Sequence, residues 1–198
     1  MNFIVANILD LENKFGEADL NMYLSDFSCG KNNIPSLNED IEIFLKTNSL
    51  DFSKQKKSIT YLIIDRDDGA LLGYFTIAHK PIVVQAKGLS NTALKRIERF
   101  SELNRDNFTY NVSAFLIAQF GKNFAVDNGK RIDGKFMMEL VDTELKFIQH
   151  RIGGGIKYLD CEPIHQLISF YHNCGFKEFS QRKSRKDNKT YLQLFKFV

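Results

Sequence analysis

The chain has 198 residues, 43% of them hydrophobic and 13% aromatic, and its formal net charge is +3. This length favours one domain, predicted to span residues 1–198, and the composition excludes an intrinsically disordered chain. The apolar run at 114–118 is far shorter than the roughly 20 residues of a membrane helix, so no membrane segment is expected. The three cysteines lack metal-ligand spacing and the N-terminus lacks a signal-peptide pattern, which predicts reduced thiols, no metal site and a cytoplasmic location.

Hydrophobic periodicity predicts the elements of the first half of the chain. A helix is expected over 37–46, with Ser36 as its N-cap and acidic residues in its first turn. Two β-rich runs, 59–65 and 71–79, flank Asp68-Gly69, which is a strong signal for a tight turn. We therefore expect an antiparallel hairpin.

The second half alternates between the two periodicities. The elements expected are helix 90–103, strand 112–120, helix 135–151, strand 156–162, helix 164–174 and strands 176–181 and 189–197. Glycines follow both later helices, where a left-handed residue commonly ends a helix. This order predicts an α/β fold with a mixed, mainly antiparallel sheet.

The loop that joins the predicted strand 112–120 to the helix after it could hold phosphate. A strand followed by a glycine-containing loop and a helix directs free N–H groups and the positive helix end to one place. Positive charge and small residues gather there, at Gly129, Lys130, Arg131, Gly134 and Lys135. The alternative is a solvated basic loop. No Walker or dinucleotide-binding glycine pattern occurs, which disfavours nucleotide hydrolysis and Rossmann redox chemistry.

Two segments resemble the GNAT acyl-CoA N-acetyltransferases. The phosphate loop of that family is similar to Arg131-Ile-Asp-Gly-Lys-Phe136, and its Tyr-x-x-x-Gly-Phe signature is similar to Tyr171-His-Asn-Cys-Gly-Phe176. Order and spacing agree over residues 59–198. The resemblance implies a GNAT-like mixed, mainly antiparallel sheet flanked by helices and splayed between strands 112–120 and 156–162.

The resemblance also implies a reaction, the direct transfer of acetyl from acetyl-CoA to a primary amine. Tyr171 would then be the general acid that serves the CoA thiolate, whereas without the resemblance it reads as a core aromatic residue. The implied acetyl-CoA contacts are Phe120, Gly121, Lys122, Lys130, Arg131, Gly134 and Lys135. The chain departs from the family in a longer loop at 121–134, in Phe136 where a small residue is usual, and in Asp133 within the phosphate loop.

The acceptor is the part of the reaction about which the sequence says least. Residues 27–45, FSCGKNNIPSLNEDIEIFL, resemble the start of the GNAT toxins of toxin–antitoxin modules, which acetylate aminoacyl-tRNA. That subgroup implies charged tRNA as acceptor and a small ribbon-helix-helix antitoxin as partner. Many relatives form dimers, so a homodimer is a further expectation. Basic groups at 54–57, 95–99 and 182–186 could bind RNA phosphates or be solvated. The alternatives are an acetyltransferase for a protein or small-molecule amine, and a non-catalytic module that binds acyl-CoA or a partner.

Other reactive side chains are expected to have structural roles. No general base is assigned, because lone histidines are more often surface or capping residues; the candidates weighed are His79, His165 and His172. The cysteines have no placed His/Asp set for nucleophilic catalysis, so Cys29, Cys161 and Cys174 are expected to serve packing.

Overall fold

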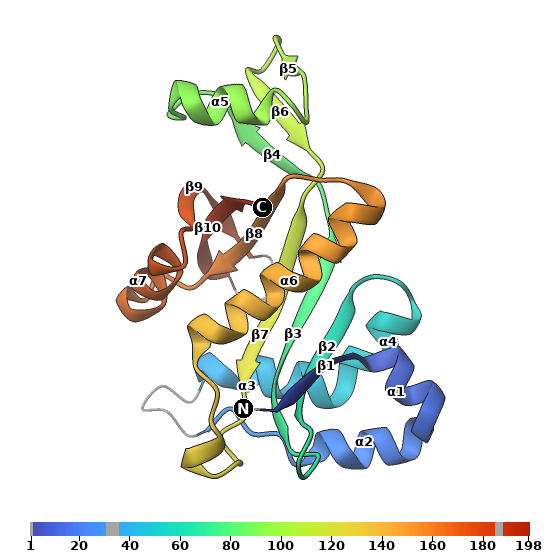
Figure 1. Cartoon of the computed structure of the whole chain (residues 1–198). Coiled ribbons are helices and arrows are strands. Elements are labelled where there is room, and N and C mark those ends of the chain that lie inside the picture. Colours follow the sequence, from blue (N-terminus) through green and yellow to red (C-terminus); the bar gives the residue numbers. More distant parts are fainter. Residues whose placement is uncertain (1, 31–35, 185–187) are drawn as a thin grey trace. The chain divides into compact units, whose positions relative to one another are not determined.

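The computed structural model describes residues 2–30, 36–184 and 188–198 (Figure 1). The chain forms two compact units. Unit 1 comprises residues 1–78 and 117–141, and unit 2 comprises residues 79–116 and 142–198. Within the described ranges, no helix combines the length and the apolar character needed to cross a bilayer.

Unit 1 begins with a strand and a group of helices. Its elements are β1 (Phe3–Asn7), α1 (Ile8–Phe15), α2 (Glu17–Ser25), α3 (Ser36–Ile43), the π-helical turn η1 (Phe44–Asn48), α4 (Ser49–Lys54), β2 (Ile59–Asp65), most of β3 (Leu71–His79) and of β7 (Phe115–Lys122), the 3-10 turn η2 (Asn128–Lys130) and the first half of α6 (Gly134–Ile152). The side chain of Asn7 caps α1 by accepting from Leu9 N. Buried apolar side chains of α1, α2, η1, β2 and β3 form one core.

Unit 2 holds the remaining elements and the second half of α6. These are β4 (Ile82–Gln85), α5 (Asn91–Ile97), β5 (Leu103–Asn104), β6 (Thr109–Val112), β8 (Ile156–Cys161), α7 (His165–Asn173), β9 (Lys177–Lys183) and β10 (Thr190–Phe197). Antiparallel pairing joins β4 and β5 to β6, and joins β8 and β9 to β10. Its core combines β4, β6, β8 and β10 side chains with Ile97 of α5.

The strands form a mixed, mainly antiparallel sheet flanked by helices, as expected. The hydrogen-bonded order is β1-β2-β3-β7-β8-β10-β9, with β4-β6-β5 as a second sheet. The parallel pairing of β7 with β8 comprises two residue pairs, Phe115↔Lys157 and Leu116↔Tyr158. The predicted hairpin is β2–β3, and Gly69 adopts the left-handed φ of +74° in its turn.

Several predicted boundaries were wrong. The run 112–120 is not one strand, because Val112 ends β6, where it pairs with Ile82, and β7 begins at Phe115. The helix expected over 90–103 ends at Ile97, because Leu103 pairs with Tyr110 in β5. The helix expected over 37–46 begins at Ser36 and continues through η1 into α4, and the predicted cap concerns a side chain outside the described residues.

Candidate functional site

The C-terminal end of β7 presents its main chain to both sides. Along a strand, the N–H and C=O groups of one residue point to the neighbouring strand on one side, and those of the next residue point to the other side. Asn123 N donates to Leu72 O of β3 at 2.9 Å. Gly121 therefore faces β3 as well, whereas the main-chain groups of Phe120 and Lys122 point to the edge opposite β3.

Gly121 has no room for a side chain. A Cβ there would lie 2.6 Å from Ile41 Cγ2, 3.3 Å from Tyr74 Cε1 and 3.4 Å from Phe27 Cζ. On β3, a Cβ on Gly73 would lie 2.9 Å from the carbonyl oxygen of Gly121. Glycines at both positions thus let β3, β7 and α3 approach closely.

We expect Gly121→Ala to lower the free energy of unfolding by about 1–3 kcal/mol, since the added methyl group overpacks a closed contact. The melting temperature should fall by roughly 2–10 °C, measured by circular dichroism. The matched control is Gly129→Ala in η2, where an added Cβ meets nothing within 4 Å. Equal melting temperatures for the two variants would contradict the packing argument.

Asn123, which the sequence analysis did not single out, joins three segments directly after β7. Its buried side chain accepts from Ser28 N and Ala125 N, both at 3.0 Å, and donates to Leu71 O at 2.7 Å. Phe124 N also donates to Ser28 O at 2.7 Å. Buried amides with several partners cost free energy when a partner is lost, so Asn123 fixes the start of the loop.

The positive side chains of the loop are partly engaged within unit 1. Lys130 contacts the carboxylate of Asp68 and lies 3.8 Å from that of Asp65, and its hydrogen bond to Asp68 raises the pKa of Lys130. Arg131 donates to Phe124 O at 3.0 Å and its guanidinium lies over the Phe124 ring. Lys130 and Arg131 thus bind the loop to neighbouring groups of unit 1.

A carboxylate already occupies the N-terminus of α6. Asp133 Oδ2 accepts from Lys135 N at 2.9 Å and from Phe136 N at 3.2 Å. These are the N–H groups that a phosphate would bind at this helix end. The expected phosphate loop is therefore formed as a strand, a loop and a helix, but with an acidic cap in place.

Tyr171 lies on α7 in unit 2 and is half-buried. Its ring makes edge contacts with Phe170 and Phe176, with centroids 5.0 and 5.9 Å away. Within the described part of the chain no hydrogen bond to its hydroxyl occurs. Burial, reinforced by Cys161 and Cys174, raises the pKa of the Tyr171 phenol above its ordinary range, so the phenol stays protonated at neutral pH.

Two of the cysteines are buried, and two of the histidines have polar neighbours. Cys29 and Cys161 are buried, and burial raises the pKa of these thiols to about 12 and about 11. Thiols with such values are poor nucleophiles, because the thiolate is the reactive form. His79 Nε2 lies 2.6 Å from Ser113 Oγ, and His172 Nε2 lies 3.6 Å from Glu178.

A buried lysine lies in unit 2 next to Phe176, which follows α7. Lys157 of β8 is fully buried, forms an ion pair with Asp142 of α6, and lies 5.1 Å from the centroid of the Phe176 ring. Lys196 of β10 shares the same carboxylate at 3.4 Å. Burial and the charge of Lys196 lower the pKa of Lys157 to about 7.

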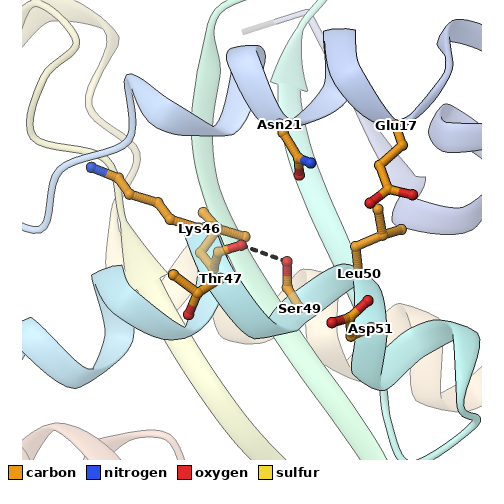
Figure 2. A pocket seen from close by; sticks show the side chains of 8 residues that line it. Glu17, Asn21, Lys46, Thr47, Ser49, Leu50 and Asp51 are labelled. Atoms are coloured by element: carbon orange, nitrogen blue, oxygen red, sulfur yellow. Dashed lines mark hydrogen bonds between the residues drawn. The ribbon is translucent and has the colours of Figure 1, made fainter.

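A separate polar pocket lies in unit 1 beside η1 (Figure 2). Its lining comes from α2, η1 and α4, namely Glu17, Asn21, Leu45, Lys46, Thr47, Ser49, Leu50 and Asp51. None of the residues implied for acetyl-CoA is among them. Its Glu17 is paired with Lys54 at 2.8 Å, so the carboxylate is already neutralised.

The predicted basic clusters divide between the units. Lys54 pairs with Glu12 and Glu17 in unit 1. In unit 2, Arg96 stacks over Phe197 and Arg182 pairs with Asp160 at 2.8 Å. Residues 185 and 186 of the third cluster lie outside the described residues. These cations have local partners, so the predicted role in RNA binding stays a prediction.

Comparison with known proteins identifies the fold. No family model and no curated protein matches the sequence. A tyrosine-to-phenylalanine mutant of KacT is similar over 100% of this chain and 95% of its own, at 16% identity and a TM-score of 0.65. AtaT complexed with acetyl-methionyl-tRNA is similar over 96% and 94%, at 12% identity and 0.61. A third structure is a tyrosine-to-phenylalanine mutant of the AtaT toxin bound to acetyl-CoA and the C-terminus of the antitoxin AtaR. It is similar over 100% of this chain and 94% of its own, at 13% identity and a TM-score of 0.61.

The likeness extends over the whole chain and includes the strand, loop and helix described above. At 12–16% identity it establishes the fold, and it does not by itself carry the function. The expected architecture is confirmed: this chain has the mixed, mainly antiparallel, GNAT-like fold that it shares with KacT and with the toxin AtaT.

Proposed function

We propose that the protein is an acetyl-CoA-dependent N-acetyltransferase of the GNAT type that transfers acetyl directly to a primary amine. The observation that carries the proposal is the end of β7, where Phe120 and Lys122 turn their main-chain groups away from β3. The fold likeness to toxins solved with acetyl-CoA supports the same reading. We place the activity in the cytoplasm, where acetyl-CoA and amine acceptors meet.

The donor would bind mainly through the main chain. Pantetheine carries amides, which can pair with the main-chain groups of Phe120 and Lys122 in the manner of an added strand, beside the close-packed Gly121. The pyrophosphate would bind at the loop before α6, with charge from Lys130, Arg131 and Lys135 and close approach at Gly134. Lys135 is exposed and has no ion pair among the described residues, so it is the readiest of these cations.

The chemistry needs an oriented amine, a stabilised oxyanion and a proton for the departing CoA thiolate. A neutral amine attacks the thioester carbonyl, main-chain N–H groups stabilise the oxyanion, and the intermediate then expels the CoA thiolate. The Tyr171 phenol is protonated at neutral pH, so it would act as the general acid that gives its proton to the departing CoA thiolate. The proton released by the attacking amine balances the one that the thiol finally gains.

We expect Asp133→Asn to tighten acetyl-CoA binding about three- to tenfold. The amide keeps an oxygen for capping α6 but removes the negative charge that competes with pyrophosphate for the N–H groups of Lys135 and Phe136. Calorimetric titration with acetyl-CoA measures the change, and Asp127→Asn in the same loop is the control. Unchanged affinity in Asp133→Asn would show that the pyrophosphate does not bind at this helix end.

For the acceptor we propose an aminoacyl-tRNA, because AtaT was solved with an acetylated aminoacyl-tRNA and shares the fold. An α-amino group has a pKa of about 7.7–8, so part of it is neutral at pH 7 without a dedicated base. The partner proposed on the same grounds is a small antitoxin, as AtaR is for AtaT. A homodimer and a single catalytic domain over residues 1–198 remain proposals as well.

The test is an acetylation assay with labelled acetyl-CoA and three acceptor pools: charged tRNA, uncharged tRNA, and peptides with small amines. Label on charged tRNA alone supports the proposed acceptor. Label on peptides or small amines instead would show that the protein acetylates a protein or small-molecule amine. Acetyl-CoA binding without transfer to any pool would overturn the enzyme and favour a binding module.

A further inference from the structure

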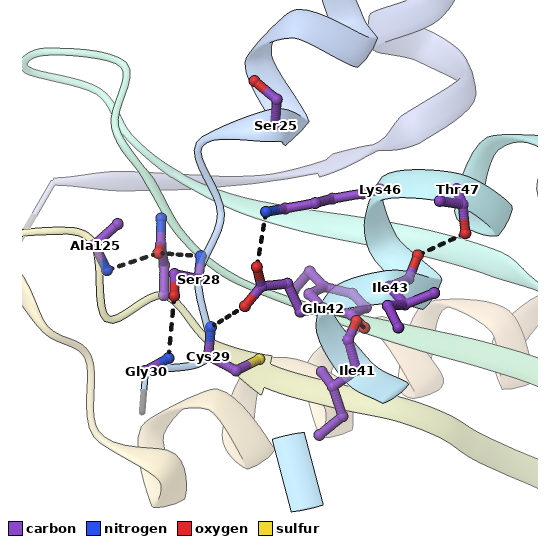
Figure 3. Close-up of polar contacts among 12 residues, drawn as sticks. Ser25, Ser28, Cys29, Gly30, Ile41, Glu42, Ile43, Lys46, Thr47 and Ala125 are labelled. Atoms are coloured by element: carbon purple, nitrogen blue, oxygen red, sulfur yellow. Dashed lines mark hydrogen bonds and ion pairs between the residues drawn. The ribbon is translucent and has the colours of Figure 1, made fainter. Parts of the chain in front are cut away.

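Residues 27–30, which follow α2, are bound on one side by the Glu42 carboxylate (Figure 3). We call residues 27–30 the strap. Its Cys29 N donates to Glu42 Oε2 of α3 at 3.1 Å, and Lys46 Nζ donates to Oε1 at 2.8 Å. The Ser28 side chain adds a further hydrogen bond. These donors, with Lys46 first, lower the pKa of Glu42, so the carboxylate is ionised at neutral pH.

The other side of the strap is bound to the residues that follow β7. Ser28 N donates to the side chain of Asn123 at 3.0 Å, and Ser28 O accepts from Phe124 N at 2.7 Å. Gly30 has a φ of +74°, and a Cβ there would lie 3.1 Å from the Phe124 side chain. The strap thus connects Glu42 to the main chain immediately after Lys122.

A second route leads from α3 to the same place. The carbonyl oxygen of Ile41, the residue before Glu42, accepts from the Tyr74 hydroxyl at 2.6 Å. The Ile41 side chain packs directly against Gly121, because a Cβ on that glycine would lie 2.6 Å from Ile41 Cγ2. A carboxylate that fixes α3 against the strap therefore also fixes this contact with the end of β7.

We propose that Glu42 is a positioning residue for the acetyl-donor site. It acts through the strap and Ile41, which hold the main chain of residues 120–124 in the geometry that pantetheine requires. The inference rests on the proposed function, since it assumes that acetyl-CoA binds at that main chain. Several separate hydrogen bonds hold these segments together, and Glu42 makes only some of them. Loss of Glu42 should therefore loosen the donor site without unfolding unit 1.

Two measurements on the full chain test it, with Glu42→Ala, Glu42→Gln and the control Glu17→Ala. Glu17 is also a carboxylate in unit 1 that is paired with a lysine, and that lysine is Lys54 of α4, outside the strap. We expect Glu42→Ala to accelerate amide hydrogen exchange at Cys29 and Phe124 at least tenfold and to raise the Kd for acetyl-CoA five- to tenfold. Glu42→Gln keeps an oxygen for Cys29 N, so it should stay within about twofold of the wild type. Glu17→Ala should match the wild type.

The outcomes separate the inference from the proposed function. Wild-type acetyl-CoA affinity in a folded Glu42→Ala overturns the inference, as does unchanged exchange at Phe124. A Glu42→Gln as weak as Glu42→Ala would also overturn it, because the bond to the strap would not matter. If Glu42→Ala does not fold, Glu42→Asp, which keeps the charge but shortens the reach, takes its place with the same expectation. Failure of the wild type itself to bind acetyl-CoA overturns the proposed function.

Discussion

Tyr171→Phe should lower kcat by about two to four orders of magnitude and leave acetyl-CoA affinity nearly unchanged. The hydroxyl is the only group lost, and a positioned proton donor typically contributes a factor of that size. Its ring is held by Phe170 and Phe176, and these contacts need no hydroxyl.

Steady-state kinetics with the identified acceptor and calorimetry with acetyl-CoA measure the two effects separately. Tyr158→Phe in β8 is the control, since it also removes a tyrosine hydroxyl from unit 2 but lies outside the proposed chemistry. Wild-type turnover by Tyr171→Phe would remove the tyrosine from the mechanism and return it to the role of a core aromatic residue.

Asp142→Ala is expected to destabilise the protein by about 1–3 kcal/mol, whereas Lys157→Met should change stability by about 1 kcal/mol or less. Removing Asp142 leaves the fully buried Lys157 with a ring and a repelling Lys196, so the lysine loses its proton and remains as a buried amine without its counter-ion. Removing Lys157 leaves Asp142, which is partly exposed and still paired with Lys196 at 3.4 Å. The asymmetry follows from where the two charges lie, not from the number of ion pairs lost.

Urea denaturation of both variants at pH 7 measures the difference, and the pH dependence gives its sign. A cation whose folded pKa is lowered from 10.5 to about 7 binds fewer protons in the folded than in the unfolded state between those values. The free energy of unfolding therefore rises with pH over that window, and this slope should disappear in Lys157→Met. Equal loss of stability in the two variants would contradict the account of the pair.

The sequence predicted those elements whose signals are local. The β2–β3 hairpin is set by Asp68-Gly69, and α6 and α7 are ended by glycines with positive φ, Gly153 and Gly175. The strand at 112–120 failed because its apolar run is continuous, while the break after Val112 is imposed by pairing with Ile82. Patterns along the chain do not show such distant partners. The helices α1 and α2, separated at Gly16, were likewise not predicted.

The candidate site divides in the same way. The loop before α6 and Tyr171 carry recognisable residue patterns, so they could be named beforehand. Asn123 and Glu42 could not, because their partners lie 95 and 13 residues away at Ser28 and Cys29. An asparagine after a strand and a glutamate in a helix look like ordinary polar residues until the strap is folded between them.

The central claim is that the end of β7 and the loop before α6 bind an acyl-CoA. Calorimetric titration of the purified protein with acetyl-CoA tests it most directly, with Tyr171→Phe and Asp133→Asn titrated alongside. The account predicts micromolar binding to the wild type, the same affinity for Tyr171→Phe and tighter binding to Asp133→Asn. No binding to any of the three proteins would contradict the account.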